Sequence, residues 1–229
     1  MYELFIANKN YSSWSLRPWL LLRELNIPFR ETLIPFGRTS GPGSFRAVSP
    51  TGRVPCLHDE GTVVWDSLGI VEYLAERHPG VWPADPKARA WARCAAAEMH
   101  AGFGALRNQC PMSCGVRVRS NPPDEALAAD LRRLDELWAE GLARFGGPFL
   151  AGGAFGAVDA FFGPVAFRVQ SYGLPLAPPG REYAARLLEL PSMRRWYDDA
   201  LAETWREPSH ERETAQAGAV IEDRRAAAT

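Results

Sequence analysis

Two neighbouring residues, Asp66 and Ser67, stand immediately before a segment whose apolar residues Ile70, Val71 and Leu74 recur at helical spacing. The first turn of a helix carries free N–H groups and a positive dipole end, so it can hold a carboxylate. The Ser67 hydroxyl would add one more donor. The same pair is also the usual composition of a plain helix cap. This segment therefore predicts a helix that begins with either an anion site or an ordinary cap.

Three more hydroxyl groups, those of Ser12, Ser13 and Ser15, lie where a short β-prone segment runs into another helical pattern. We expect the helix to begin at one of them. Side chains of this type commonly cap a helix or satisfy loop groups, and at least one of the three has that role. Further along, Pro55 after Val54 has two interpretations. The bond between them could be cis, which holds for only about 5 to 6% of isolated X-Pro bonds, or Pro55 could be an ordinary proline of an edge strand.

Composition restricts the classes of partner. The 229 residues include 26 basic and 27 acidic side chains, which gives no electrostatic support for binding nucleic acid or a membrane surface. The four cysteines are too sparse for a disulfide scaffold, and Cys110 and Cys114 lack further metal ligands nearby. We therefore expect a small-molecule partner and no metal. The start of the chain shows no signal-peptide pattern, and no apolar run of about 18 residues occurs, so we expect a cytoplasmic protein.

The first part of the chain has the element order that would position these residues. Apolar alternation and turn signals predict strands, and the two helical patterns already described fall between and after them. The predicted order is βαβ, a loop and then ββα, with strands at 2–7, 28–34, 54–58 and 62–65 and helices from Ser13 and Ser67. Such a unit makes a four-stranded mixed sheet with helices on it.

The second part is predicted to be a helical bundle. A Pro-rich segment divides the two, so we expect a domain at 1–78, a linker at 79–86, an all-helical domain at 87–205 and a tail at 206–229. Helical spacing predicts helices at 86–107, 123–145, 157–172 and 191–201. No strand is expected after residue 90, and the polar, aperiodic tail is expected to be loosely ordered.

Four segments in this order resemble the glutathione S-transferase superfamily, over about residues 2 to 203. The segment from Ser12 to Pro18 is similar to the SSCxWR motif of the zeta class, and Ser49–Leu57 is similar to NPxGKVPxL. Asp66–Leu74 is similar to (E/D)SxAIxxYL, and Phe155–Ala160 is similar to the FSxAD capping motif. The resemblance implies a thioredoxin-like α/β N-terminal domain followed by an all-α C-terminal domain, with glutathione as co-substrate.

The resemblance also assigns roles around glutathione. It implies that the bond before Pro55 is cis and that Val54 turns its backbone N–H and C=O toward the cysteinyl unit. Asp66 would face the γ-glutamyl ammonium and Ser67 its carboxylate. Arg53 and Ser15 are also expected to border the tripeptide.

The sulfur needs a residue that stabilises the thiolate, because a free thiol with a pKa near 8.5 is mostly protonated at neutral pH. A serine hydroxyl that donates to the thiolate contributes about 1.5 to 3 kcal/mol, or about one to two pKa units. Counting back from the helix arginine selects Ser13, and aligning the serine pair selects Ser12. Ser15 ranks below both. Trp14 replaces the motif cysteine, which excludes a mixed disulfide at that position.

The resemblance implies an enzyme that transfers glutathione to small, mostly apolar electrophiles, which is a detoxification reaction. It also implies a homodimer in which Asp66 and Arg53 lie near the two-fold axis. A glutathione-dependent isomerase of the maleylacetoacetate type, or a dehalogenase, is an alternative. The isomerase interpretation is weakened because Ser171 stands where that class has a helix arginine, with Arg168 as the nearest basic residue. Arg168, Tyr172 and the segment 111–114 could line the second-substrate pocket. A non-catalytic binding protein of the same fold is a further alternative.

Overall fold

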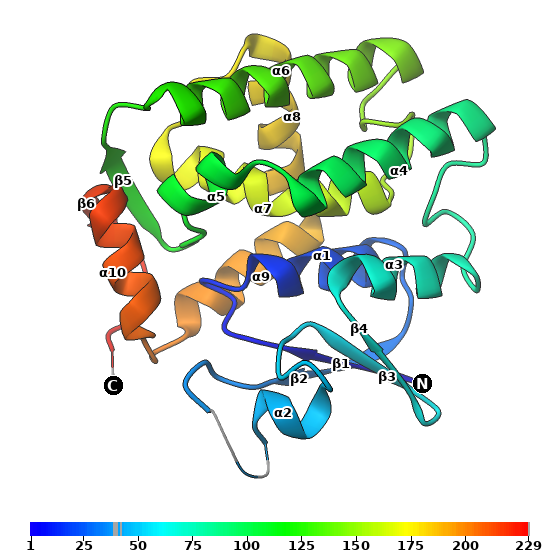
Figure 1. The fold of residues 1–229 in the computed structure, drawn as a ribbon, viewed down its shortest axis with the longest axis horizontal. Coiled ribbons are helices and arrows are strands. Elements are labelled where there is room, and N and C mark those ends of the chain that lie inside the picture. Colours follow the sequence, from blue (N-terminus) through cyan, green and yellow to red (C-terminus); the bar gives the residue numbers. More distant parts are fainter. Residues whose placement is uncertain (39–40, 42, 229) are drawn as a thin grey trace.

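The N-terminal part of the chain forms a four-stranded mixed sheet with helices on it (Figure 1). The computed structural model describes residues 1–38, 41 and 43–228. Strand order is β2-β1-β3-β4, with β1 and β2 parallel and the other pairs antiparallel. The elements are β1 (Tyr2–Ile6), α1 (Ser13–Glu24), β2 (Phe29–Leu33), α2 (Phe45–Val48), β3 (Cys56–Asp59), β4 (Thr62–Trp65) and α3 (Ser67–Ala75). The predicted order of strands and main helices is confirmed.

The second part is mostly helical and is built around one buried helix, α7 (Ala157–Tyr172). Its neighbours include α1 of the first part, so the hydrophobic core is continuous between the two parts. The proposed linker 79–86 coincides with the loop between α3 and α4, except that Pro86 already begins α4. The further helices are α4 (Pro86–Ala101), α5 (Gly104–Gln109), α6 (Glu125–Phe145), α8 (Pro178–Glu189), α9 (Pro191–Ala202) and α10 (Pro208–Ala217).

The single helix expected over 86–107 is two helices, α4 and α5. The chain breaks at Gly102 and Phe103, where Phe103 has a left-handed backbone with φ of 54°. A Cβ on Gly102 would lie 2.7 Å from the carbonyl oxygen of Glu98, so this close turn requires glycine. The glycines at 102 and 104 are the usual sequence signal of a helix end, and this signal was overlooked.

Two further expectations were wrong, since strands do occur after residue 90 and the tail is ordered. Strand β5 (Val116–Ser120) pairs antiparallel with β6 (Gly218–Asp223), and α10 precedes β6 directly. In β5 the buried Val116 and Val118 alternate with arginines, a pattern of a half-buried strand that was overlooked. The partner strand comes from the far end of the chain, where Thr229 alone lies outside the described residues.

The segment 155–160 is a helix cap with a larger role than capping. Asp159 is fully buried, and its carboxylate accepts hydrogen bonds from Gly156 N (3.0 Å), Leu150 N (3.0 Å) and the Tyr183 hydroxyl (2.7 Å). The predicted bond back to the Gly156 backbone is therefore confirmed. The two other bonds join α7 to the 146–156 loop and to α8.

None of the helices in the described part of the chain is long and apolar enough to cross a membrane.

Candidate functional site

The loop before β3 leaves backbone groups available for a ligand. The Val54–Pro55 bond is cis, as the resemblance implied, and Pro55 is buried while Val54 is half-buried. Within the described residues, the N–H and C=O of Val54 have no hydrogen-bond partner. Val54 also lines a cavity of about 500 Å³ that includes Thr51 and Arg53. An extended peptide backbone placed there would find one free donor and one free acceptor.

The N-terminus of α3 borders the same cavity. Ser67 is buried, whereas the side chain of Asp66 is 48% exposed and accepts a bond from Leu68 N at 2.7 Å. Asp66 has a φ of 69°, which is rare for a residue with a side chain and costs on the order of 1 to 3 kcal/mol. The other carboxylate oxygen lies 3.6 Å from His100 Nε2. Asp66 therefore both caps α3 and presents negative charge at the cavity edge.

A buried arginine lies behind Ser67. The guanidinium of Arg17 lies over the rings of Trp14 and Phe161, at 4.3 and 4.7 Å from their centroids, and its Nη1 is 3.5 Å from Ser67 Oγ. Its Nε has no hydrogen-bond partner, and none of the described residues forms an ion pair with it. Burial lowers the pKa of Arg17 to about 9, which leaves it charged at neutral pH. An unpaired buried cation favours a bound anion nearby.

The three serines occupy different environments at the start of α1. Ser12 is buried, and its hydroxyl donates to Ser15 Oγ at 2.7 Å. Ser15 is fully buried, and its oxygen also accepts a bond from Ala7 N at 3.2 Å. Ser13 is half-buried, and its hydroxyl has no hydrogen-bond partner among the described residues. The Ser13 hydroxyl is thus the free donor of the set, and Ser15 supports Ser12 from inside the protein.

A second cavity of about 460 Å³ adjoins the first, since Trp14, Arg53 and Val54 line both. Its wall includes Ser12 and Ser13. The structure therefore brings the expected residues into one continuous region. Pro55, Asp66 and Ser67 lie at the first cavity, the two serines at the second, and Arg53 and Val54 between them. Ser15 lines neither cavity, because it is enclosed beneath the start of α1.

The far wall of the second cavity comes from helices of the second part. Arg168 of α7 is almost fully buried, and it donates to Cys110 O at 2.8 Å and Pro164 O at 3.3 Å. Arg107 of α5 lies with its guanidinium 5.2 Å from the Trp14 ring centroid. Neither arginine has an ion-pair partner within the described ranges. Burial lowers the pKa of Arg168 to about 10, so the cavity wall stays positively charged at neutral pH.

Sequence reasoning missed several residues of this region. Trp14 was noted only as a departure from a motif, yet it lines both cavities. His210 and Glu213 of α10 line the second cavity, although their segment was expected to be loosely ordered. Of the segment 111–114, Pro111 and Met112 line this cavity, whereas the expected lining residue Tyr172 does not. Tyr172 is buried and donates to Pro111 O at 2.7 Å, so it supports the wall from behind.

Comparisons with known proteins agree with this geometry. Residues 11–77 match the N-terminal domain model of glutathione S-transferases, and residues 124–199 match the C-terminal domain model. A probable maleylacetoacetate isomerase of Caenorhabditis elegans is 32% identical over 98 residues, which are 42% of this chain and 45% of the relative, so the chain spans less than half of it. The maleylacetoacetate isomerase of Rattus norvegicus is 24% identical over 181 residues, 76% of this chain and 81% of the relative.

Among solved structures, a theta class glutathione S-transferase from Xanthomonas axonopodis pv. citri, with glutathione bound, is 28% identical with a TM-score of 0.62. The match covers 86% of this chain and 96% of that chain. Both domain models, the order of elements and this structural match lead to one conclusion: the chain belongs to the glutathione S-transferase superfamily.

Proposed function

We propose that this protein binds glutathione at the first cavity and transfers it, as a thiolate, to a small electrophile held in the second. The observation that carries the proposal is that three features able to bind parts of a peptide thiol lie around the two adjoining cavities. These are the backbone of Val54, the start of α3 at Ser67 and the hydroxyl of Ser13, and within the described ranges neither the Val54 backbone nor the Ser13 hydroxyl has a hydrogen-bond partner. Several superfamily members of this fold have been solved with glutathione bound, which supports the same assignment.

The tripeptide fits these features in an extended form. The γ-glutamyl carboxylate would lie against the start of α3, where Ser67 and the helix dipole favour an anion and Arg17 supplies charge from behind. Its ammonium would face Asp66. The cysteinyl backbone would pair with Val54, and Arg53, which is exposed at the cavity edge, would border the glycyl end. The sulfur would then reach the start of α1.

At that position Ser13 is proposed to donate a hydrogen bond to the thiolate, with Ser12 as the alternative donor. A bond to a charged acceptor contributes about 1.5 to 3 kcal/mol. Because the bond is stronger for thiolate than for thiol, it lowers the pKa of the bound sulfur. Addition or substitution at an electrophilic carbon follows from that nucleophile.

The second cavity indicates what the electrophile carries. Phe36, Met112 and Pro111 give it apolar walls, while Arg107 and Arg168 add unpaired positive charge. We propose a small apolar electrophile with an acidic group, to which these arginines can donate charge-assisted hydrogen bonds. A glutathione-dependent isomerase is the second candidate. That class has a helix arginine where this chain has Ser171, but Arg168, on the same helix, lines the second cavity and could take the place of that arginine. Ser171 is buried and donates to Ser113 O at 2.8 Å, so it has a structural contact instead.

The test is a matched pair of electrophiles, one neutral and one with a carboxylate, offered together with glutathione. We expect kcat/KM to favour the acid by roughly tenfold or more, the equivalent of one charge-assisted hydrogen bond. Arg168→Met and Arg107→Met should each reduce that preference, and Arg93→Gln, on the exposed face of α4, should leave it unchanged. Equal kcat/KM for the two compounds would reject the acidic substrate, and failure to bind glutathione would reject the function itself.

We also propose that the protein works as a homodimer. Strand β4 is an edge of the sheet, and it exposes Val63 (38%) and Trp65 (48%) beside the exposed Arg53 and Asp66. An exposed apolar edge of this kind is typical of a surface that is covered in an oligomer. Light scattering at micromolar concentration is expected to give twice the 25.3 kDa of one chain. Trp65→Glu should shift the mass toward one chain, and a monomeric wild type would contradict the proposal.

A further inference from the structure

The C-terminal segment, residues 200–228, passes along the second cavity and is called the strap below. It lies beyond residue 199, where the match to the C-terminal domain model ends. Figure 1 shows α10, in orange-red, running beside β5 and β6 and close to the loop that leads into α1. This helix brings His210 and Glu213 to the wall that also holds Ser12 and Ser13.

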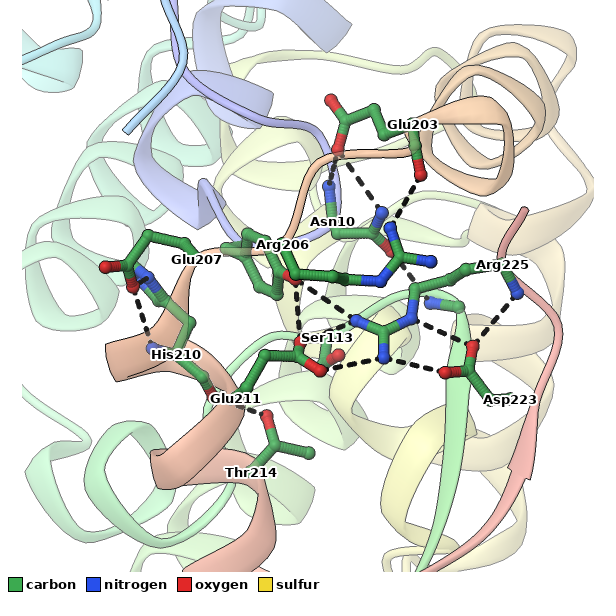
Figure 2. Close-up of polar contacts among 12 residues, drawn as sticks. Asn10, Ser113, Glu203, Arg206, Glu207, His210, Glu211, Thr214, Asp223 and Arg225 are labelled. Atoms are coloured by element: carbon green, nitrogen blue, oxygen red, sulfur yellow. Dashed lines mark hydrogen bonds and ion pairs between the residues drawn. The ribbon is translucent and has the colours of Figure 1, made fainter. Parts of the chain in front are cut away.

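An arginine near the end of the chain holds the strap in place (Figure 2). The Arg225 side chain is only 5% exposed and pairs with Glu211 at 2.6 Å and with Asp223 at 2.8 Å. Its Nη1 also donates to the Tyr11 hydroxyl at 3.1 Å, and Tyr11 donates to Glu211 at 2.7 Å. Earlier in the segment, Glu203 accepts bonds from Lys9 N and Asn10 N. The strap is thus fixed to the loop that immediately precedes the serines.

Within the strap, His210 is oriented from three sides. Its Nδ1 lies 2.6 Å from Glu207 Oε2. Its ring stacks on Tyr11, with centroids 5.0 Å apart and planes at 23°, and also contacts Phe36 at 4.7 Å. Across the described residues Nε2 has no hydrogen-bond partner, and the ring forms part of the cavity wall. A histidine with one nitrogen on a carboxylate and the other free at a cavity has the arrangement of a proton-transfer group.

The partner carboxylate is suited to that role. Burial alone would raise the pKa of Glu207, but hydrogen bonds from Ser209 and from the backbone and ring of His210 outweigh it and lower the pKa to about 2. Glu207 is therefore a carboxylate at any working pH. Its Oε2 can accept a hydrogen bond from the Nδ1–H of His210, and this bond fixes the orientation of the ring.

We propose that His210, positioned by Glu207, carries the proton in the transfer reaction, an inference that rests on the function proposed above. Nε2 accepts the proton of the glutathione thiol, leaving the thiolate that Ser13 stabilises. The sulfur lone pair then forms the S–C bond, and the displaced electron pair moves onto the substrate as a carbanion or enolate, or onto a departing group. The protonated Nε2 returns its proton to that atom, so glutathione and substrate give the product with no other reactant.

The experiment compares variants of the strap under saturating glutathione. His210→Asn keeps an amide that can donate to Glu207 in place of Nδ1 but removes Nε2, and His210→Gln serves as a second replacement. We expect kcat to fall by roughly 100-fold, the lower range for general acid–base catalysis. Glutathione affinity should stay unchanged, whereas the thiolate titration of bound glutathione should move to higher pH, because the thiol loses the base that accepts its proton. Arg212→Gln, on the exposed side of α10 with no partner in the described chain, is the matched control and should keep wild-type kcat.

The dependence of kcat on pH separates proton transfer from support of the fold. We expect the kcat profile of His210→Asn to lose a pH-dependent step that wild type and Arg212→Gln retain. Glu207→Gln should lower kcat less than His210→Asn does, because Nε2 remains but the ring loses the carboxylate that orients it. The charged and titratable groups that line this cavity with the ring, and that stay constant across these variants, are Tyr11, Arg53, Arg107, Arg168 and Glu213. Glu211 and Arg225 contact Tyr11, on which the ring stacks.

Added imidazole should restore part of kcat in His210→Asn and have no effect on Arg212→Gln. Unchanged kcat and pH profile in both His210 variants would overturn the proposal while leaving glutathione transfer intact. Absence of glutathione binding by the wild type would instead reject the function on which it depends.

Discussion

Asp159→Ala is expected to lower the free energy of unfolding by about 3 kcal/mol or more. The carboxylate is fully buried and accepts from Leu150 N, Gly156 N and the Tyr183 hydroxyl, so alanine leaves three buried donors without an acceptor. Each such donor costs about 1 to 3 kcal/mol, and the gain from no longer burying a carboxylate offsets part of that sum. Chemical denaturation followed by Trp fluorescence measures the change.

Tyr183→Phe provides the matched comparison for that variant. It removes one donor but keeps the ring, whose centroid lies 4.8 Å from that of Trp138. Asp159→Ala should therefore cost less in the Tyr183→Phe background than in wild type, which is the sign expected for coupled residues. Asp198→Ala, on the exposed face of α9, should change stability by less than about 0.5 kcal/mol. Equal costs of Asp159→Ala in both backgrounds would mean that the two residues do not act through this hydrogen bond.

The parts of the site predicted from sequence are those formed by short, continuous segments. Asp66 and Ser67 cap α3 because a helix start depends on adjacent residues, and the order of strands around it follows from local alternation. Asp159 reaches back three residues to the Gly156 backbone in the same way. In such segments the interacting groups are neighbours in the chain, so their spacing is visible in the sequence.

The parts that were missed depend on contacts between distant segments. Strand β6 pairs with β5, which lies about a hundred residues earlier in the chain. The two strands approach closely at Gly218, where a Cβ would clash with the Arg119 carbonyl oxygen. Arg225 is ordered by Tyr11 and Glu211, and none of these residues is unusual in its own local sequence. The polar composition of the tail suggested disorder because its charges are exposed locally, whereas in the fold they pair with one another.

Because of these contacts between distant segments, charged and titratable residues of the second cavity come from elements whose local sequence does not indicate a site. Arg168 lies on the buried helix α7, and His210 on the strap, yet both face the cavity that holds Ser13. Two apparently unrelated features, the arginines at the cavity and the ordered strap, therefore line the same cavity. The start of α1 is the point common to both cavities, and the largest catalytic effect is expected there.

Ser13→Ala is expected to raise the pKa of bound glutathione by about one to two units and to reduce the reactive thiolate roughly 10- to 100-fold near neutral pH. The hydroxyl has no hydrogen-bond partner among the residues that the structure describes, so it can donate to the sulfur. A donor that favours thiolate over thiol lowers the thiol pKa. Its loss shifts the whole activity profile toward higher pH, and raising the pH should restore part of the rate. Affinity for glutathione should change little, because Val54, Asp66 and Ser67 are proposed to make most of the contacts, with the cysteinyl backbone, the ammonium and the carboxylate respectively.

Ser12→Ala is the matched variant, and the geometry predicts a smaller direct effect from it. The Ser12 hydroxyl already donates to Ser15 at 2.7 Å, so it must give up that bond before it can serve the sulfur. The measurement is the ultraviolet absorbance of the bound thiolate against pH, for wild type and for each variant. A larger shift in Ser12→Ala than in Ser13→Ala would move the donor role to Ser12. If neither variant shifts the titration, both serines act only in the local structure of α1, and a backbone amide at the start of that helix must stabilise the thiolate instead.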